Sequence, residues 1–139
     1  MKKFAALVLS LLFLISSSNT ITALGAEKQR RSEIITPLYE STNIINAQLQ
    51  ISGQNAICNG LVKGKNFVNK IEVEMTLQKK TLLWWSKVET WSKVEYNSLV
   101  EIEKSHLIEN GTYRVKISAT VYNGDAKETV DAYSAEKKK

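Results

Sequence analysis

Hydrophobic and polar residues alternate one by one over several segments of the chain. The alternation is cleanest in residues 71–77 (IEVEMTL), and it recurs in residues 45–51, 56–62, 99–103 and 113–121. A period of two places successive side chains on opposite faces of an extended backbone. Each segment is therefore predicted to be a β-strand with one buried face.

Turn-forming residues separate these segments at intervals of 8–14 residues, as in residues 52–55, 63–66, 110–111 and 123–125. A last strand is expected through Thr129, Val130 and Tyr133, and no long helical pattern follows the N-terminal region. Short strands at regular spacing are typical of antiparallel sandwiches and barrels. The main part of the chain, residues 41–135, is therefore expected to form an all-β sandwich of seven to eight strands.

The N-terminal region has a different pattern from the rest of the chain. Lys2 and Lys3 precede an apolar run over residues 4–15, and small and polar residues follow up to Ala26. This order is typical of a cleaved secretory signal helix over residues 1–26, with cleavage after Gly25 or Ala26. The run is shorter than the roughly 20 residues of a membrane-spanning helix, which disfavours an uncleaved anchor.

The segments that flank the predicted sandwich are expected to be peripheral. Residues 27–40 begin with charged side chains and contain Pro37, so they are predicted to form an N-terminal arm or an edge strand, where proline is tolerated. Residues 136–139 are predicted to be a disordered basic tail.

Composition narrows the classes of function. The chain has 139 residues, which is room for one domain, and its single cysteine excludes an internal disulfide. Its net charge is +5, and loss of residues 1–26 removes two lysines and no acidic residue, leaving +3. This excess is too small to indicate nucleic-acid binding, and export argues further against it.

A short repeat follows the third alternating segment. The sequence WSKVE begins at Trp85 and again at Trp91. The offset of six is even, so an ideal strand carries both tryptophans on one face together with Lys and Glu, and that face is expected to be exposed. A bulge between the repeats would reverse the faces and bury one tryptophan. A helix is disfavoured because Ser, Thr, Val and Trp are weak helix formers.

Two short motifs resemble immunoglobulin-like domains. The stretch 110–115 (NGTYRV) resembles the start of strand F, where the hydroxyl of a tyrosine, here Tyr113, bonds to upstream backbone. The stretch 56–60 (AICNG) resembles strand B, with Cys58 at one half of the usual disulfide and Val115 at the other half. The resemblance implies an immunoglobulin-like antiparallel sandwich that lacks this disulfide.

Residues 32–39, 75–92 and 111–122 are also similar to a group of small exported proteins of Gram-positive bacteria. That group is a domain family of unknown function. The resemblance implies a fold and a compartment, and it supplies no catalytic residue and no cofactor.

The residues that carry catalytic chemistry are few. His106 is the single histidine; it is expected on a surface loop, and no nucleophile-elbow motif surrounds it. Cys58 shares a strand face with Ala56 and Val62, which predicts a buried, inert thiol, with intermolecular pairing as the alternative.

Metal ions and paired acids are not indicated either. One His and one Cys stand 48 residues apart, and the two aspartates, Asp125 and Asp131, form no calcium loop. The glutamate pairs 72/74 and 101/103 fit the polar face of a strand better than a pair of catalytic acids. No enzyme activity, metal or cofactor is expected.

One group of residues is a candidate binding surface. Exposed tryptophans can stack on sugar rings, insert at a membrane interface or anchor a protein partner. In a small sandwich they can instead be core or edge-covering residues. The expected patch consists of Trp84, Trp85, Trp91, Lys79, Lys80, Lys87 and Lys93.

The sequence therefore predicts an exported, non-catalytic binding module, released or loosely held at the cell surface, with a cell-wall glycan or a protein as its partner. The alternative is a cationic membrane-active or toxin-like protein, because the positive charge and the pair Trp84 and Trp85 favour anionic envelopes. The mixture of Lys and Glu in the repeat counts against this alternative.

Overall fold

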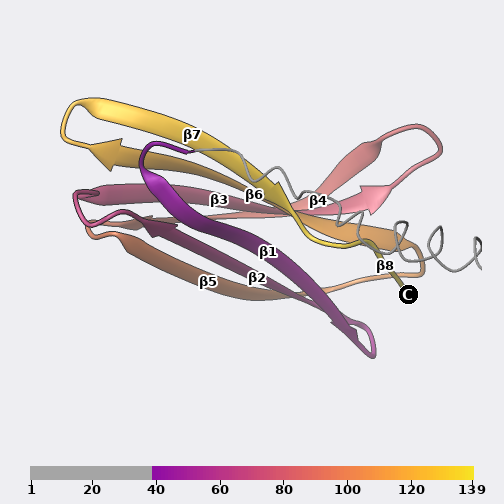
Figure 1. Ribbon diagram of the computed structural model, residues 1–139. Coiled ribbons are helices and arrows are strands. Elements are labelled where there is room, and N and C mark those ends of the chain that lie inside the picture. The colour runs from indigo at the N-terminus through magenta and orange to yellow at the C-terminus, as the bar shows by residue number, and fades with distance from the viewer. Residues whose placement is uncertain (1–38) are drawn as a thin grey trace, which may run out of the picture. The chain divides into compact units, whose positions relative to one another are not determined.

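The computed structural model describes residues 39–139, and all of its regular elements are β-strands (Figure 1). The predicted signal helix, residues 1–26, and nearly all of the predicted arm, residues 27–40, lie outside the described residues. The described residues contain no helix long and apolar enough to cross a membrane. The strands are β1 (Thr42–Ser52), β2 (Asn55–Gly64), β3 (Lys70–Lys80), β4 (Trp85–Glu95), β5 (Leu99–Leu107), β6 (Thr112–Asn123), β7 (Ala126–Tyr133) and β8 (Lys137–Lys138).

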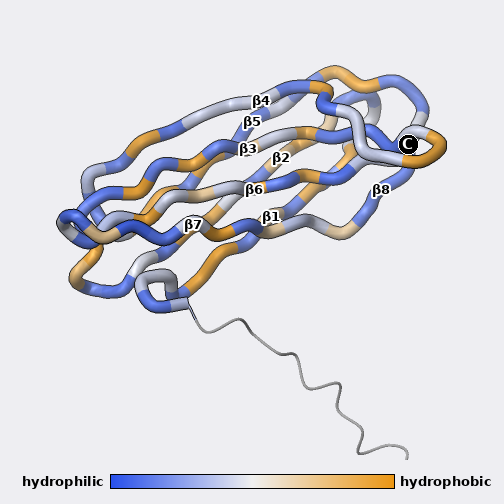
Figure 2. Tube along the Cα trace, turned by 90° about the horizontal axis from the view of Figure 1, so that it is seen from above, coloured by the Kyte–Doolittle hydropathy of each residue, from blue (hydrophilic) through white to orange (hydrophobic). Residues whose placement is uncertain are grey.

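The strands form two antiparallel sheets. One has the order β1-β2-β5 and the other the order β4-β3-β6-β7, with β8 paired to the start of β6. Figure 2 looks down on the two stacked sheets, with the second sheet nearer to the viewer than the first. With β1, β2 and β5 as strands A, B and E, and β3, β6 and β7 as C, F and G, β4 is an added strand beside C. The predicted immunoglobulin-like sandwich of seven to eight strands is confirmed.

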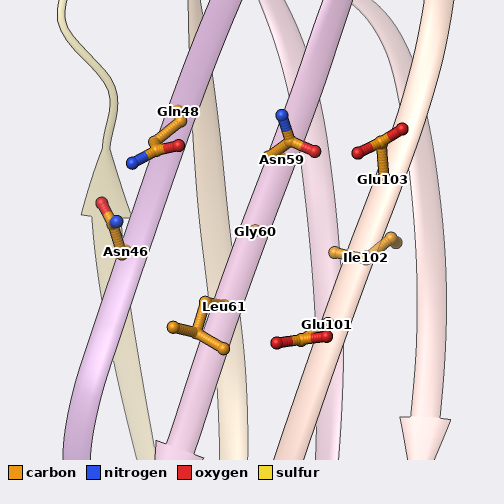
Figure 3. Close-up of a pocket in the computed structure, with 8 residues that line it drawn as sticks. All are labelled: Asn46, Gln48, Asn59, Gly60, Leu61, Glu101, Ile102 and Glu103. Atoms are coloured by element: carbon orange, nitrogen blue, oxygen red, sulfur yellow. The ribbon is translucent and has the colours of Figure 1, made fainter.

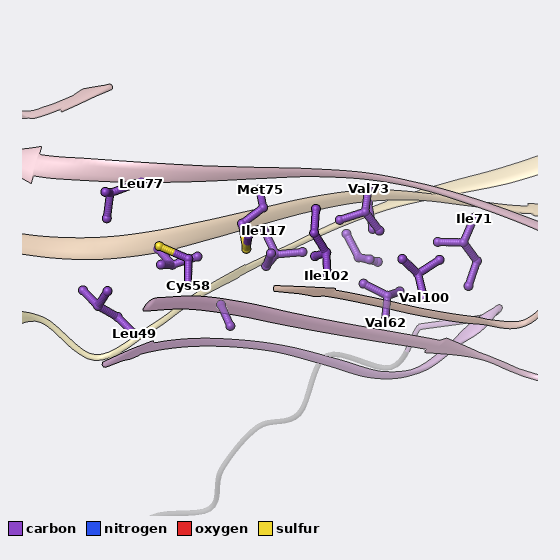
Figure 4. Packing of buried hydrophobic residues seen from close by; sticks show 14 of the residues in the cluster. Leu49, Cys58, Val62, Ile71, Val73, Met75, Leu77, Val100, Ile102 and Ile117 are labelled. Atoms are coloured by element: carbon purple, nitrogen blue, oxygen red, sulfur yellow. The ribbon is translucent and has the colours of Figure 1, made fainter. Parts of the chain in front are cut away.

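The core lies between the two sheets and uses the positions that alternation predicts. In β6, every second residue from Tyr113 to Val121 is buried, and the residues between them are half-buried. Removal of these apolar side chains from water is the main driving force for the fold. Figure 4 shows part of this cluster. Its largest fully buried side chains are Tyr113, Ile71, Met75, Leu77, Ile117, Val62, Val100, Val115, Val121 and Val130.

Gly60 on β2 allows the two sheets to approach closely. A Cβ atom at this position would lie 2.5 Å from Cδ1 of Ile117 on the opposite sheet. It would also lie 3.0 Å from Cγ2 of Ile102 on the neighbouring strand. The missing side chain therefore leaves the space that Ile117 fills.

Tyr113 forms the corner that the resemblance to immunoglobulin-like domains implies. Its ring is buried at the start of β6, and its hydroxyl donates a hydrogen bond to the carbonyl oxygen of Glu109 at 2.9 Å. Cys58 on β2 and Val115 on β6 are both fully buried. The motif that resembles strand F thus has the local geometry of that strand.

Two hairpins turn through glycine. The loops at Gly53 and Gly124 are two residues long, and both glycines have a φ of +59°. Residues with a side chain rarely adopt this conformation, which is common in two-residue hairpins. The turns predicted at residues 52–55 and 123–125 are confirmed.

The C-terminal residues are paired, so the prediction of a disordered tail over residues 136–139 is wrong. β8 pairs with Thr112 and Tyr113 of β6, and the N–H of Lys139 donates to the carbonyl oxygen of Gly111 at 2.9 Å. β7 ends before it reaches this part of β6. The backbone groups of β6 that β7 leaves free form hydrogen bonds with the tail, and these bonds outweigh the charge repulsion among its lysines.

Glu128 on β7 ties the beginning of β1 to the second sheet. Its carboxylate accepts hydrogen bonds from the N–H of Glu40 at 2.7 Å, the N–H of Ser41 at 3.1 Å and the hydroxyl of Thr42 at 2.8 Å. Burial by itself raises the pKa of Glu128, but these hydrogen bonds together lower the pKa below its usual value.

Candidate functional site

The two WSKVE repeats lie on β4, and a bulge separates their tryptophans. Leu77 of β3 pairs with Glu89, whereas the next residue, Gln78, pairs with Lys87, which leaves Val88 as an extra residue. An extra residue reverses the order in which side chains face inward and outward. The expectation for an ideal strand, that both tryptophans share one exposed face, is therefore wrong, and the alternative of a bulge that reverses the faces is confirmed.

Trp91 faces the core side of β4. It pairs with the fully buried Met75, it is half-buried against the core, and its ring meets His106 edge-on with 6.3 Å between centroids. His106 belongs to β5, the edge strand of the other sheet, so the two rings close one side of the sandwich. Lys93 donates to the carbonyl oxygen of Glu101 across the same gap at 2.9 Å. Trp91 and Lys93 are thus edge-covering residues.

The two residues considered for catalysis lie in structural positions. His106 lies within β5, because that strand keeps its pairing with β2 as far as Leu107, so the prediction of a loop is wrong. Cys58 is buried as predicted, and burial raises the pKa of its thiol to about 11. Within residues 39–139, no three His, Cys, Asp or Glu side chains gather where a metal ion would fit.

Trp85 faces outward and belongs to a stack of side chains on the second sheet. It pairs with Lys80 on the outer side of β3. The guanidinium carbon of Arg114 lies 4.2 Å from the Trp85 ring centroid and 4.4 Å from that of Tyr133. Nε of Arg114 donates to Oε1 of Gln78 at 2.8 Å. Planar guanidinium groups stack well on aromatic faces. Trp85, Arg114 and Tyr133 are called the ladder below.

The turn between β3 and β4 carries three consecutive exposed apolar side chains. Leu82, Leu83 and Trp84 are 101%, 87% and 63% exposed. The N–H and the hydroxyl of Thr81 both donate to the carbonyl oxygen of Trp84 at 2.8 Å, which closes the turn. Residues 81–84 are called the tip below. In Figure 1 the hairpin that carries the tip extends away from the rest of the sandwich.

Lysines surround the tip. Residues 79–87 contain three lysines and no acidic residue. Lys80 lies with Nζ 5.5 Å from the Trp85 ring centroid and 3.2 Å from a carboxylate oxygen of Glu136, while Lys87 is exposed. The members of the predicted patch that the structure brings together at this end are Trp84, Trp85, Lys79, Lys80 and Lys87.

Sequence reasoning missed the two leucines of the tip and two members of the ladder. Leu82 and Leu83 stand beside Trp84, and Lys80 and Lys87 flank this apolar run in the sequence. That pattern could have marked a hairpin tip. Alternation could also have placed Arg114 on the outer face. The contact of Arg114 with Tyr133 depends on the pairing of β6 with β7, which no local pattern reveals.

A second candidate is an open hollow on the outer face of the first sheet, with a volume of about 400 Å³ (Figure 3). Its amides and carboxylates can form hydrogen bonds. The side chains that line it include no aromatic ring on which a sugar could stack, so the tip is the stronger candidate. The outward-facing side chains that line the hollow form two rows across the sheet, Gln48–Asn59–Glu103 and Asn46–Leu61–Glu101.

No family model matches the chain, and no curated protein matches it. Among solved structures, the chain is similar to the crystal structure of wild-type OgpA from Akkermansia muciniphila, with 12% sequence identity and a TM-score of 0.39. The match covers 76% of this chain and 33% of that chain, so the present chain spans about a third of OgpA. A likeness at this level carries no conclusion about function.

Proposed function

We propose that the chain is an exported, non-catalytic binding module that holds its target with the tip of the β3–β4 hairpin. One observation carries this proposal: Leu82, Leu83 and Trp84 are consecutive in sequence, and the closed turn keeps all three largely in water. Single exposed apolar residues are common on protein surfaces, whereas large ones that stand together mark interaction sites.

The position of the tip supports this function. It lies on a loop between two strands that are paired along their length, and loops on rigid sandwiches are a frequent place for binding residues. The ladder lies directly beside the tip, because Trp85 follows Trp84 in sequence; Trp85 is half-buried against Arg114, and Tyr133 is exposed. The N-terminal pattern of residues 1–26 supports export.

The environments of His106 and Cys58 support binding rather than catalysis. His106 packs against Trp91 at the edge of the sandwich, and Cys58 is sealed in the core with its thiol protonated at neutral pH. Each residue thus has a structural explanation. A nucleophilic cysteine would need an open, electropositive environment that lowers the thiol pKa.

The test compares matched variants of the exported form, residues 27–139, which keeps all eight strands of the described residues. In the tip variant, Leu82, Leu83 and Trp84 are each replaced by Ser. In the control variant, Phe67 and Tyr96 are replaced by Ser. These two aromatic residues are 51% and 79% exposed and lie at the opposite end of β3 and β4.

The measurement is cosedimentation with envelopes of a Gram-positive bacterium that contain both wall and membrane. We expect the wild type and the control variant to sediment with the envelopes and the tip variant to stay in solution. Equal sedimentation of the tip variant and the wild type would contradict the proposal, and so would a wild type that stays in solution.

A further inference from the structure

We infer that the target of the tip is the surface of an anionic lipid bilayer, into which Leu82, Leu83 and Trp84 insert while the neighbouring lysines contact lipid headgroups. This inference rests on the proposed function, because it names the partner of the same tip.

The side chains of the tip fit lipid better than they fit a glycan or a protein pocket. Leu82 and Leu83 have no flat face for stacking on a sugar and no group that can bond to a hydroxyl. They stand free at the end of a projecting hairpin, so a target must receive them from outside. Hydrocarbon receives leucine side chains readily, and tryptophan prefers the boundary between hydrocarbon and water.

The charge around the tip is complementary to anionic headgroups. Residues 79–87 carry three lysines and no acid, and the nearby start of β6 carries Arg114 beside the paired basic tail of residues 137–139. Two acidic residues lie at the same end: Glu136, which forms an ion pair with Lys80, and Glu109 in the loop before β6. The excess positive charge therefore comes from Lys79, Lys87, Arg114 and the basic tail. Each Lys or Arg close to an anionic surface strengthens binding about fivefold at low salt.

The glutamates of the WSKVE repeats do not oppose this inference, although the sequence alone counts them against membrane binding. Glu89 and Glu95 lie beyond the bulge and pair with Leu77 and Ile71, whose side chains face the core. Lys87 lies before the bulge, where the chain presents its side chain to the outer face. The bulge therefore separates the lysine near the tip from both acids.

The geometry of the hairpin matches the depth of the membrane interface. At a rise of about 3.3 Å per residue, Lys80 stands roughly 7 Å from Leu82 and Lys87 stands roughly 13 Å from Leu83. Interfacial segments bury their apolar groups about 5–10 Å deep, which leaves such lysines at the headgroups. The closed turn at Thr81 holds the apex in shape before binding, so insertion loses little conformational freedom.

The test is flotation of the exported form with vesicles of two compositions, pure phosphatidylcholine and an equal mixture of phosphatidylcholine and phosphatidylglycerol. We expect the wild type and the control variant to float with the anionic vesicles and to bind the neutral vesicles at least tenfold more weakly. We expect the tip variant to bind the anionic vesicles at least about a hundredfold more weakly, because burial of one leucine contributes roughly tenfold or more.

A charge variant tests the lysines separately. Replacement of Lys87 by Gln should lower binding to the anionic vesicles about fivefold at low salt and should leave the weak binding to neutral vesicles unchanged. Binding of the wild type should also weaken as salt rises, because exposed charges are screened. A charge variant that binds as well as the wild type would overturn the inferred role of Lys87.

Tryptophan fluorescence reports the position of the tip directly. On addition of anionic vesicles, the emission of the wild type should shift to the blue and become sensitive to quenching by lipids with brominated acyl chains. Both changes should disappear when Trp84 is replaced by Ser, although Trp85 and Trp91 remain. Persistence of both changes in that variant would overturn the inferred insertion of Trp84.

The outcomes separate this inference from the proposed function. Tip-dependent sedimentation with envelopes, combined with no binding to vesicles, would overturn the lipid target and leave the binding module intact, with a glycan or a protein as its partner. Equal binding of the tip variant and the wild type in both assays would overturn both proposals. Equal binding to the two vesicle compositions would overturn the preference for anionic lipid.

Discussion

Single residues decide how closely the two sheets pack. Gly60 leaves the space that Ile117 occupies from the opposite sheet, while Cys58, on the same face of β2, fills its own place as a small apolar residue. Both positions are fully enclosed. The size of a side chain there matters more than its polarity, because interiors are close-packed and adjust little.

Gly60→Ala should destabilise the protein by about 1–3 kcal/mol, because the added Cβ would lie 2.5 Å from Cδ1 of Ile117. Ile117→Val removes that Cδ1 atom, and alone it should cost about 0.5–1.5 kcal/mol. The double variant should therefore lose less stability than the sum of the two single losses. Urea unfolding of the four proteins measures this coupling, and additive losses would mean that the sheets adjust by another route.

Cys58→Val should be close to neutral, with a change in the free energy of unfolding under about 1.5 kcal/mol, because it nearly conserves buried volume. Because Cys58 is fully buried, a thiol reagent should not modify it in the native protein at neutral pH, where burial also keeps the thiol protonated. Measurement of reagent uptake with and without urea checks this. Rapid uptake without urea would show that the thiol is accessible.

Pairs of elements decide which side chains meet at the surface. The extra residue Val88 turns one part of β4 inward and the other outward, so a single strand both covers the edge of the sandwich with Trp91 and builds the ladder with Trp85. The pairing of β6 with β7 brings Tyr133 to Arg114. At the other end of the sandwich, Glu128 joins β7 to the beginning of β1.

The contact between Glu128 and β1 should make stability depend on pH. The pKa of Glu128 is lower in the folded protein than the roughly 4.3 of a free glutamate. Its contribution to stability is therefore complete above that value and is lost as the pH falls through the folded pKa. The urea midpoint of the wild type should fall between pH 5 and pH 3 by more than that of Glu128→Gln.

The comparison with Glu128→Gln isolates this residue, because Glu72 also has a lowered pKa from its hydrogen bond with Lys70 and is present in both proteins. Amide hydrogen exchange gives a second measurement. The N–H groups of Glu40 and Ser41 should exchange faster in the variant, since both donate to the carboxylate. Unchanged exchange would show that β1 is held there by other contacts.

In the molecule as a whole, the core and the tip are separate. The buried cluster lies between the sheets, whereas Leu82 and Leu83 lie beyond the ends of both strands of their hairpin and remain in water. The proposed contact of the tip with a target therefore does not draw on side chains that stabilise the core.

The tip variant, with Leu82, Leu83 and Trp84 replaced by Ser, should keep the thermal stability of the wild type. Each exposed substitution of this kind changes the free energy of unfolding by about 0.5 kcal/mol or less, which for a domain of this size is a shift in Tm of about 2–4 °C for each residue replaced. Circular dichroism during heating measures it. A fall in Tm of more than about 10 °C would mean that the tip is part of the folded core.

The strands and their buried faces could be predicted from the sequence because alternation is a local property. Residues 71–77 and 113–121 have a period of two, and any antiparallel partner buries the same face. The turns at Gly53 and Gly124 could be predicted for a similar reason, since glycine is favoured wherever φ must be positive. The corner at Tyr113 followed from a short motif that resembles strand F.

The orientation of the tryptophans on β4, the ladder and the paired tail depended on contacts between segments that are distant along the chain, whereas the tip itself is local in sequence. The bulge at Val88 arises from the register of β4 against β3, and two copies of the same pentapeptide therefore face opposite ways. The ladder needs β7 beside β6, and the paired tail needs the part of β6 that β7 leaves free. Such contacts follow from which backbone groups and side chains lie next to one another in the folded chain, and alternation along a single strand carries no information about its neighbours.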